Sequence, residues 1–361
     1  MLKILLLGVA AIAAVAVIAT AGFLAYRSFR QADAAKALAI STPDGINEAM
    51  FVRIGGIDQW VQIRGEHRSN PVILVMHGGM AMSYMPFTKA FQPWEKRFTV
   101  VQWDRRGVGK TFGRNGARGS GEMSLDRIAD DGIELSQFLA RHLHKRKIIL
   151  LGHSMGSQIG VTMAVRRPDL FHVYVATEQV VDMADNEAES YRIVGERLLQ
   201  QGDAKALATF RRIGPPPYPT PMTWGGKQAL VEKADPIYGR FMHQDMGSML
   251  MFGPAYSPKD LVDFVMANSF SGSKLYPQWM AFDARKLGTR FGEPVVVIMG
   301  EHDVMTPTHL VQAWLNSLQA PRKELVLLKG AGHLSMMTAP AAYLAALETH
   351  VRPLAVEDPE L

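Results

Sequence analysis

The chain has 361 residues, with 48% hydrophobic and 20% charged residues, which is enough to bury a large core and excludes an intrinsically disordered protein. Lys and Arg outnumber Asp and Glu by only 39 to 34; the two basic clusters, 105–118 and 141–147, are expected to be solvated surface, so no nucleic-acid partner is predicted. Because the chain has no cysteine, disulfides and thiol catalysis are excluded.

The N-terminus begins with an apolar segment. Residues 4–26 are 23 consecutive uncharged residues, which as a helix would span about 34 Å and cross a hydrocarbon core of about 30 Å. Ala19-Thr20-Ala21 is typical of a signal-peptide cleavage site. Because the apolar run continues past that site, we expect a membrane anchor over 1–26, with a secreted or periplasmic protein released by cleavage as the alternative. Residues 27–48 are predicted to be a linker or a short helix.

From about residue 49, short apolar runs alternate with helical patterns. Two runs within 51–65 predict an opening antiparallel pair. The later runs are rich in β-branched residues, as in strands that are buried on both faces of a parallel sheet; they lie at 71–79, 98–107, 147–156, 173–179, 294–303 and 324–333. The alternation predicts an α/β fold with a mostly parallel, twisted sheet and helices on both faces, formed by 49–181 and 286–361.

The alternation stops between 182 and 285. This stretch has few strand signals, several helical pieces and many methionine and aromatic residues. We expect it to be a helical cap placed over the sheet, with its methionines used for packing rather than for cofactor contact.

The segment 152–156, Gly-His-Ser-Met-Gly, matches G-x-S-x-G directly after a predicted strand and before a predicted helix. A sharp strand-to-helix turn exposes the serine at the end of the sheet, and the flanking glycines avoid clashes with neighbouring chain. Ser154 is therefore the candidate nucleophile.

A serine nucleophile needs a base and a carboxylate that orients the base. Asp303 and His333 follow the last two predicted strands, in the order Ser, Asp, His that goes with this motif. Since the carboxyl ends of parallel strands meet at one edge of a sheet, the three side chains are expected to meet there. The N–H groups of Met155 and Gly79 are the candidate oxyanion hole. No metal or organic cofactor is implied.

The stretch 103–111, WDRRGVGKT, ends like a phosphate-binding loop. A P-loop would require glycine at position 104, where this chain has Asp104. Because a carboxylate there would repel phosphate, nucleotide binding is not expected.

The motifs HGG at 77–79, DRRGVGKT at 104–111, GHSMG at 152–156, GEHD at 300–303 and GAGH at 330–333 together resemble the α/β-hydrolase superfamily, most closely its proline iminopeptidase-like branch, the S33-type serine peptidases. The resemblance covers about 50–350. It implies the α/β-hydrolase fold and makes 104–111 a turn that braces the oxyanion loop. The chain departs from the family's H-G-G-P-G at Met80 and Ala81, and from its D-Q-R-G at Arg105.

The peptidases of this family hold a substrate's free amine with acidic residues near the cap, and Glu178, after the sixth strand, is the candidate for that role; a solvated or capping carboxylate is the alternative. We predict a serine hydrolase that cleaves an ester or amide bond of a small-molecule or short-peptide substrate, through an acyl-enzyme on Ser154. His333 would be the base and Asp303 would orient it. A carboxylesterase acting on small apolar acyl esters is the first alternative, and a non-catalytic binding protein on the same scaffold is the second.

Overall fold

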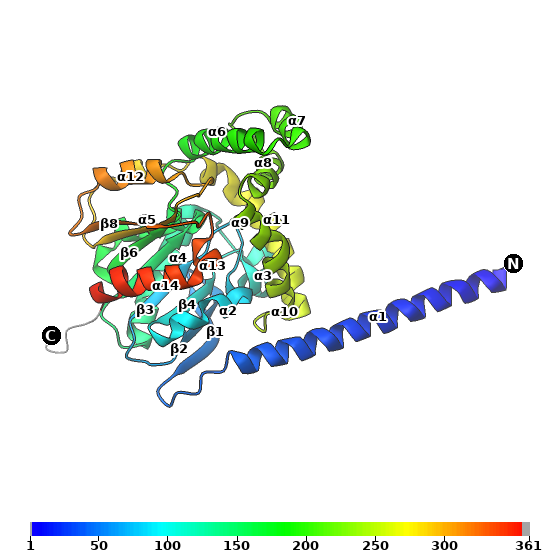
Figure 1. Cartoon of the computed structure of the whole chain (residues 1–361). Helices are drawn as coiled ribbons and strands as arrows, with labels where there is room; N and C mark the ends of the chain where they lie inside the picture. Colours follow the sequence, from blue (N-terminus) through cyan, green and yellow to red (C-terminus); the bar gives the residue numbers. More distant parts are fainter. Residues whose placement is uncertain (1, 356–361) are drawn as a thin grey trace.

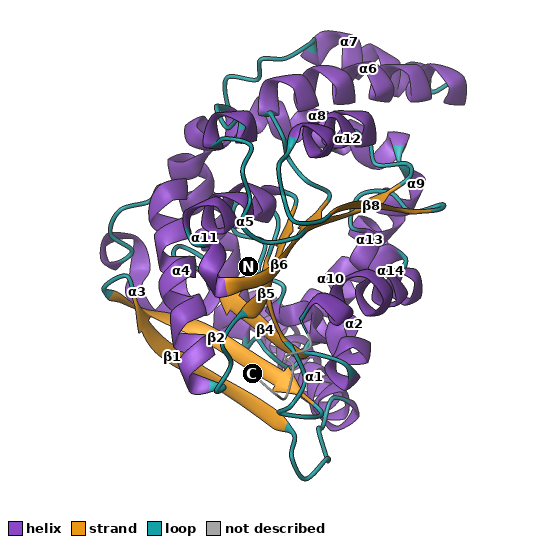
Figure 2. Ribbon diagram, turned by 90° about the vertical axis from the view of Figure 1, so that its left-hand side faces the viewer, coloured by secondary structure: helices purple, strands orange, loops and turns teal. Residues whose placement is uncertain are grey.

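A sheet of eight strands forms the centre of the molecule in the computed structural model, which describes residues 2–355 (Figures 1 and 2). Its spatial order is β1-β2-β4-β3-β5-β6-β7-β8; β2 pairs antiparallel with β1 and with β4, and the other neighbours pair parallel. The predicted α/β fold with a mostly parallel sheet is confirmed. The strands are Ile46–Ile54 (β1), Ile57–Gly65 (β2), Val72–Met76 (β3), Thr99–Asp104 (β4), Ile148–His153 (β5), Phe171–Thr177 (β6), Val295–Gly300 (β7) and Lys323–Leu328 (β8).

Helices surround the sheet (Figure 2). They are Leu2–Ala37 (α1), Thr88–Phe91 (α2), Gly109–Gly119 (α3), Leu125–His142 (α4), Met155–Arg166 (α5), Met183–Gln201 (α6), Ala204–Ile213 (α7), Pro221–Ala234 (α8), Pro236–Arg240 (α9), Met246–Phe252 (α10), Pro258–Met280 (α11), Thr308–Ser317 (α12), Ser335–Thr338 (α13) and Pro340–Ala346 (α14).

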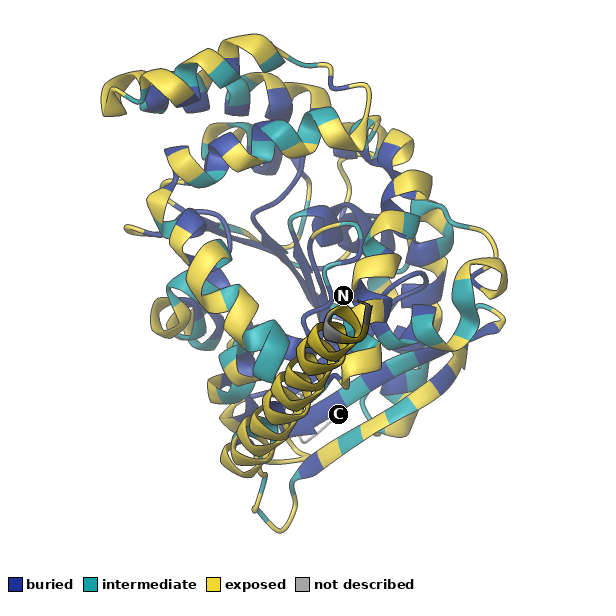
Figure 3. Cartoon of the chain, turned by 90° about the vertical axis from the view of Figure 1, so that its right-hand side faces the viewer, coloured by how far each residue is buried: buried dark blue, intermediate teal, exposed yellow. Residues whose placement is uncertain are grey.

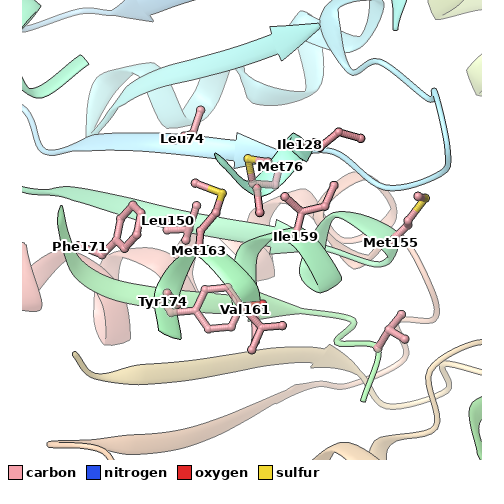
Figure 4. Packing of buried hydrophobic residues seen from close by; sticks show 14 of the residues in the cluster. Leu74, Met76, Ile128, Leu150, Met155, Ile159, Val161, Met163, Phe171 and Tyr174 are labelled. Atoms are coloured by element: carbon pink, nitrogen blue, oxygen red, sulfur yellow. The ribbon is translucent and has the colours of Figure 1, made fainter. Parts of the chain in front are cut away.

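Successive side chains of the central strands enter two different cores. Leu74 belongs to one core cluster with Ile128 of α4 and Ile159 of α5 (Figure 4). Its neighbour Ile73 belongs to a second cluster with Tyr343 of α14. Because side chains alternate along a strand, helices on both faces bury every residue of β3, β5 and β7. The continuous apolar runs of the sequence reflect this double burial.

Between β6 and β7 the described chain forms the helices α6 to α11 and no named strand. An isolated bridge pairs Asp182 with Asp283, so this segment leaves the core and returns to it at adjacent points. Figure 1 shows α6, α7 and α8 above the sheet, and α10 and α11 along one side of it. We propose that 182–285 is the cap and that the rest of the chain from 49 onward is the core.

Helix α1 continues beyond the predicted end of the apolar segment. It runs to Ala37, so residues 27–37, which the sequence predicts to be a linker or a short helix, extend the same helix. Alanine and long side chains favour helix here, and no glycine or proline interrupts 27–37. The large apolar side chains from Leu5 to Leu24 are exposed to solvent, as the projecting helix in Figure 3 shows. Helix α1 is long and apolar enough to cross a membrane.

The stretch 104–111 joins three parts of the fold. The carboxylate of Asp104, at the end of β4, accepts the Lys110 N–H at 2.8 Å in the first turn of α3 and the Tyr256 hydroxyl at 2.8 Å. The guanidinium of Arg106 forms a buried ion pair with Asp131 of α4, at 2.7 Å. These contacts fix the end of β4 against α3, α4 and the segment before α11.

Candidate active site

Ser154 occupies a tight turn between β5 and α5. Its backbone has φ = +50° and ψ = −125°, a strained conformation for a residue with a side chain, and its N–H donates to the carbonyl of Thr177 at 3.0 Å. A Cβ atom at Gly156 would lie only 2.1 Å from the carbonyl oxygen of Met76. Glycine is therefore required at 156 for α5 to start against the end of β3, and this places Ser154 at the carboxyl edge of the sheet.

The structure brings Ser154, His333 and Asp303 together. The Ser154 hydroxyl lies 3.1 Å from His333 Nε2, and His333 Nδ1 lies 2.9 Å from Asp303 Oδ2. Asp303 also accepts the hydroxyl of Thr306 at 2.6 Å, together with the N–H groups of Met305 and Thr306. With Nδ1–H donating to the carboxylate, Nε2 is free to accept the serine proton.

Burial and pairing act in opposite directions on the two titratable partners. Burial lowers the pKa of His333, but the charge and hydrogen bond of Asp303 outweigh it, so this pKa lies above its ordinary value. Burial raises the pKa of Asp303, but His333 and the bonds from Thr306 outweigh it, so this pKa lies below its ordinary value. The pair therefore stabilises a protonated imidazole beside an ionised carboxylate.

The two residues predicted to form the oxyanion hole, Met155 and Gly79, lie on segments that border the cavity of Ser154. Met155 is the first residue of α5, where N–H groups have no acceptor within the helix. Gly79 has φ = +61°, which glycine adopts without steric cost. The neighbouring Gly78 directs its N–H to the Tyr84 hydroxyl at 3.2 Å and is thus already engaged. Met155 and Gly79 both line the same cavity as Ser154.

Arg105 holds the loop that carries Gly79. The expectation that the basic cluster 105–118 is solvated surface is wrong for this residue, which is completely buried. Its guanidinium donates to the carbonyls of His77 at 2.9 Å, Gly79 at 2.7 Å and Met80 at 3.1 Å. Burial lowers the pKa of Arg105 to about 9, while Tyr84 and Asp104 oppose the shift. The predicted brace is therefore chiefly this arginine, at the position where the resembling family has glutamine.

Glu178 does not line the cavity, contrary to its prediction as a ligand for a substrate amine. Its carboxylate is fully buried, 2.8 Å from His153 Nε2, and it accepts the N–H of Ser335 at 3.2 Å. His153 Nδ1 lies 2.6 Å from the Tyr84 hydroxyl. Since burial raises the pKa of Tyr84 and lowers that of His153, the phenol donates to a neutral imidazole.

His153, the second histidine of the site, therefore has a structural role beside His333. It links the loop of Gly78, through Tyr84, to the turn of Ser154 and to the segment after His333, which begins with Ser335. The sequence could not indicate this role, because Glu178 and His153 come together only through the parallel pairing of β5 with β6.

A cavity of about 260 Å³ opens over Ser154 and His333. Its wall is mainly apolar, and much of that wall comes from the proposed cap. Met242 and Met246 of the proposed cap line it. Other lining residues with apolar side chains include Met80, Met82, Phe87, Trp224, Phe241 and Trp279.

Three polar groups of the cavity were missed by the sequence analysis. Glu232 is the one carboxylate that lines it among the described residues. The amide of Gln228 and the indole N–H of Trp279 are buried without a hydrogen-bond partner in the part of the chain that is described. Trp224, Gln228 and Glu232 recur every four residues on one face of α8, a detectable pattern, but the sequence does not say that this face meets the cavity.

A family model described as the alpha/beta hydrolase fold matches residues 71–340. The chain belongs to the α/β-hydrolase family. The hydrolase is 28% identical over 309 residues to the probable aminopeptidase YbaC of Bacillus subtilis (strain 168). This match covers 83% of the hydrolase and 94% of the relative.

Two solved structures show the same fold at low identity. A proline iminopeptidase of Mycobacterium smegmatis has a TM-score of 0.57 at 17% identity and covers 86% of the hydrolase and 99% of that chain. A bacterial membrane phospholipase A has a TM-score of 0.57 at 16% identity, and the match covers 98% of the hydrolase and 99% of that chain. The expected likeness to the proline iminopeptidase-like branch is thus confirmed at the level of the fold.

Protonation of His333 should follow the charge of Asp303. We expect the imidazole of the hydrolase to titrate above the ordinary histidine pKa of about 6.5, because the carboxylate stabilises its charged form. Asp303→Asn should lower this pKa by removing the charge. Both values can be measured by NMR titration of the imidazole resonance that a His333→Gln variant lacks. An unchanged pKa in Asp303→Asn would contradict the pairing.

Arg105 should be required for the geometry of the Gly79 loop. We expect Arg105→Met to lower kcat by roughly 10²–10³, the effect of losing one oxyanion donor, because three carbonyls lose their partner and the loop can rotate. Arg105→Gln, which restores the residue of the resembling family, should keep more activity. Equal loss in both variants at unchanged thermal stability would instead assign the effect to the positive charge.

Proposed function

We propose that this hydrolase cleaves ester or amide bonds of substrates with a small apolar acyl group, through an acyl-enzyme on Ser154. The observation that carries the proposal is the continuous chain from the Ser154 hydroxyl through His333 to Asp303, at the floor of an apolar cavity. His333 Nε2 can accept a proton only while the proton of the neutral imidazole is on Nδ1, and the hydrogen bond to Asp303 favours that tautomer.

In the first half-reaction, Ser154 Oγ attacks the carbonyl carbon and its proton passes to His333 Nε2. The carbonyl oxygen takes the negative charge and is held by the N–H groups of Met155 and Gly79. When the tetrahedral species collapses, the bond to the leaving oxygen or nitrogen breaks, and His333 gives that atom the proton. Alcohol or amine departs and the acyl group stays on Ser154.

In the second half-reaction, water replaces the leaving group. His333 takes a proton from the water as its oxygen attacks the acyl carbon, and the same two N–H groups again hold the oxyanion. Collapse returns the proton to Ser154 Oγ and releases the carboxylic acid. The sum is one water consumed for one ester or amide bond cleaved, and every proton moves through one imidazole nitrogen.

An aminopeptidase acting on apolar N-terminal residues is the second candidate. Glu232 lines the cavity from the cap, and its carboxylate lies 3.0 Å from the exposed His243. Its second oxygen could pair with a substrate's free amine, the role for which Glu178 lies outside the cavity lining. The similarity to a protein named as a probable aminopeptidase also supports this candidate.

For localisation, we propose that the apolar part of α1 anchors the enzyme in a membrane, with a cleaved signal sequence as the alternative.

A fluorophosphonate probe should label the wild-type protein at Ser154, since the probe reacts only with an activated serine. Ser154→Ala should abolish labelling and lower kcat by roughly 10⁴–10⁶ with an unchanged fold, checked by circular dichroism. Full hydrolysis by Ser154→Ala would exclude the acyl-enzyme. Absence of any adduct on the wild-type protein would favour a binding protein on a hydrolase scaffold.

Glu232 should distinguish the two substrate classes. Kinetics on p-nitrophenyl acyl esters and on aminoacyl-arylamides would be compared between wild type and Glu232→Gln. If the enzyme is an aminopeptidase, KM for the arylamide should rise about tenfold or more in the variant, because a charge-assisted bond to the amine is lost, while ester kinetics change little. Turnover of esters alone by the wild type would remove the aminopeptidase candidate.

A further inference from the structure

The C-terminal part of α1 is docked on the proposed cap. Figure 1 shows α1 passing beside α10 before it projects away from the molecule. At the point of contact the rings of Tyr26 and Phe252 meet edge to face with centroids 5.7 Å apart, and the guanidinium of Arg30 lies over Phe252 at 5.1 Å. Helix α1 therefore touches the cap through specific side chains and is not merely tethered to the core.

Arg27 is the centre of this contact. It is only 3% exposed, although the helix before it is exposed to solvent. Its guanidinium donates to the carbonyls of Met251 at 2.9 Å and Tyr256 at 2.8 Å, and to the Gln31 side chain at 2.9 Å. The Gln31 amide donates in turn to the carbonyls of Gly253 at 2.7 Å and Tyr256 at 2.9 Å.

These carbonyls belong to the end of α10 and to the turn that follows it. The last four carbonyls of a helix have no acceptor role within the helix and lie at the negative end of its dipole. Arg27 therefore caps α10 from a different helix, with a cation at the end where a cation is favoured. Tyr256, which supplies one of the carbonyls, is anchored to the core through its hydroxyl on Asp104.

The opposite end of α10 forms part of the substrate cavity. Met246 is its first residue and lines the cavity, as do Phe241 and Met242 in the turn just before it. α10 continues α9 and the π-helical turn Phe241–Asp245 without a break, so a contact that holds its C-terminal end also positions the cavity-lining residues 241–246 on the same helix. Arg27 and Gln31 hold the C-terminal end of α10, and its N-terminal end forms part of the cavity wall.

We propose that α1 is a working part of the cap, in which Arg27 and Gln31 are positioning residues that set the α10 wall of the cavity and thereby select the acyl group. This inference rests on the proposed acyl hydrolysis for its kinetic readout. It assigns to α1 a role beyond that of a membrane anchor. Cleavage at 19–21 would leave both residues in place, whereas a protein lacking residues 1–30 would have lost Arg27.

The test uses the full chain in detergent with p-nitrophenyl esters from acetyl to octanoyl. In Arg27→Met, KM should rise about tenfold for the longer acyl groups that reach Met246, as expected when charge-assisted hydrogen bonds that hold the wall are lost, while acetyl-ester kinetics and fluorophosphonate labelling stay within threefold. Lys36→Met, which removes an exposed charge from the same helix, is the matched control and should behave as wild type.

An acyl-length profile in Arg27→Met equal to that of Lys36→Met would overturn the proposal. If Arg27→Met does not fold, Gln31→Leu decides, because it removes the two bonds from Gln31 to the carbonyls and the bond from Arg27 to Gln31, and keeps the arginine; it should shift the profile in the same direction. Hydrogen exchange of the amides in α10 supplies a readout without turnover. If the wild type hydrolyses neither the esters nor the aminoacyl-arylamides, the proposed function fails, and faster exchange in Arg27→Met alone would still establish the brace; unchanged exchange would reject it.

Discussion

The close approach of α5 to the end of β3 is the constraint on which the site depends. No side chain fits at Gly156, because the carbonyl oxygen of Met76 occupies the space where a Cβ would lie. This contact fixes where α5 begins, and with it the direction of Ser154 and of the Met155 N–H. It also places both beside the loop that leaves β3 and carries Gly79. One steric condition thus aligns a side chain and two separate backbone segments.

The two histidines beside Ser154 show how environment divides one residue type into two roles. His333 faces the ionised Asp303, and its pKa lies above the ordinary value. His153 is equally buried, contacts Glu178 and donates no proton to a cavity group, and its pKa lies below the ordinary value. Their rings are 5.2 Å apart. A second protonated imidazole at that distance would oppose the protonation of His333, so a neutral His153 favours the proton transfer.

Sequence reasoning predicted well what local pattern determines. The strands, the antiparallel start, the elbow around Ser154 and the meeting of His333 with Asp303 at one sheet edge follow from apolar runs and from strand order. It failed where a role depends on which segments pack together. The sequence could not show that Glu178 pairs with His153 instead of binding a substrate, because that contact depends on the pairing of β5 with β6. The buried hydrogen bonds of Arg105 depend on a loop that is distant in sequence.

The bridge between Asp182 and Asp283 has a consequence for how such an enzyme can diversify. A hundred residues are inserted through two neighbouring points, so their length and composition can change without altering the register of any strand. Replacement of the segment between these two points would change the part of the cavity wall that the proposed cap supplies, while Ser154 and the core residues around it stayed the same. In this chain such an exchange has an extra condition, because a new module must also offer backbone carbonyls to a helix that precedes the entire catalytic core.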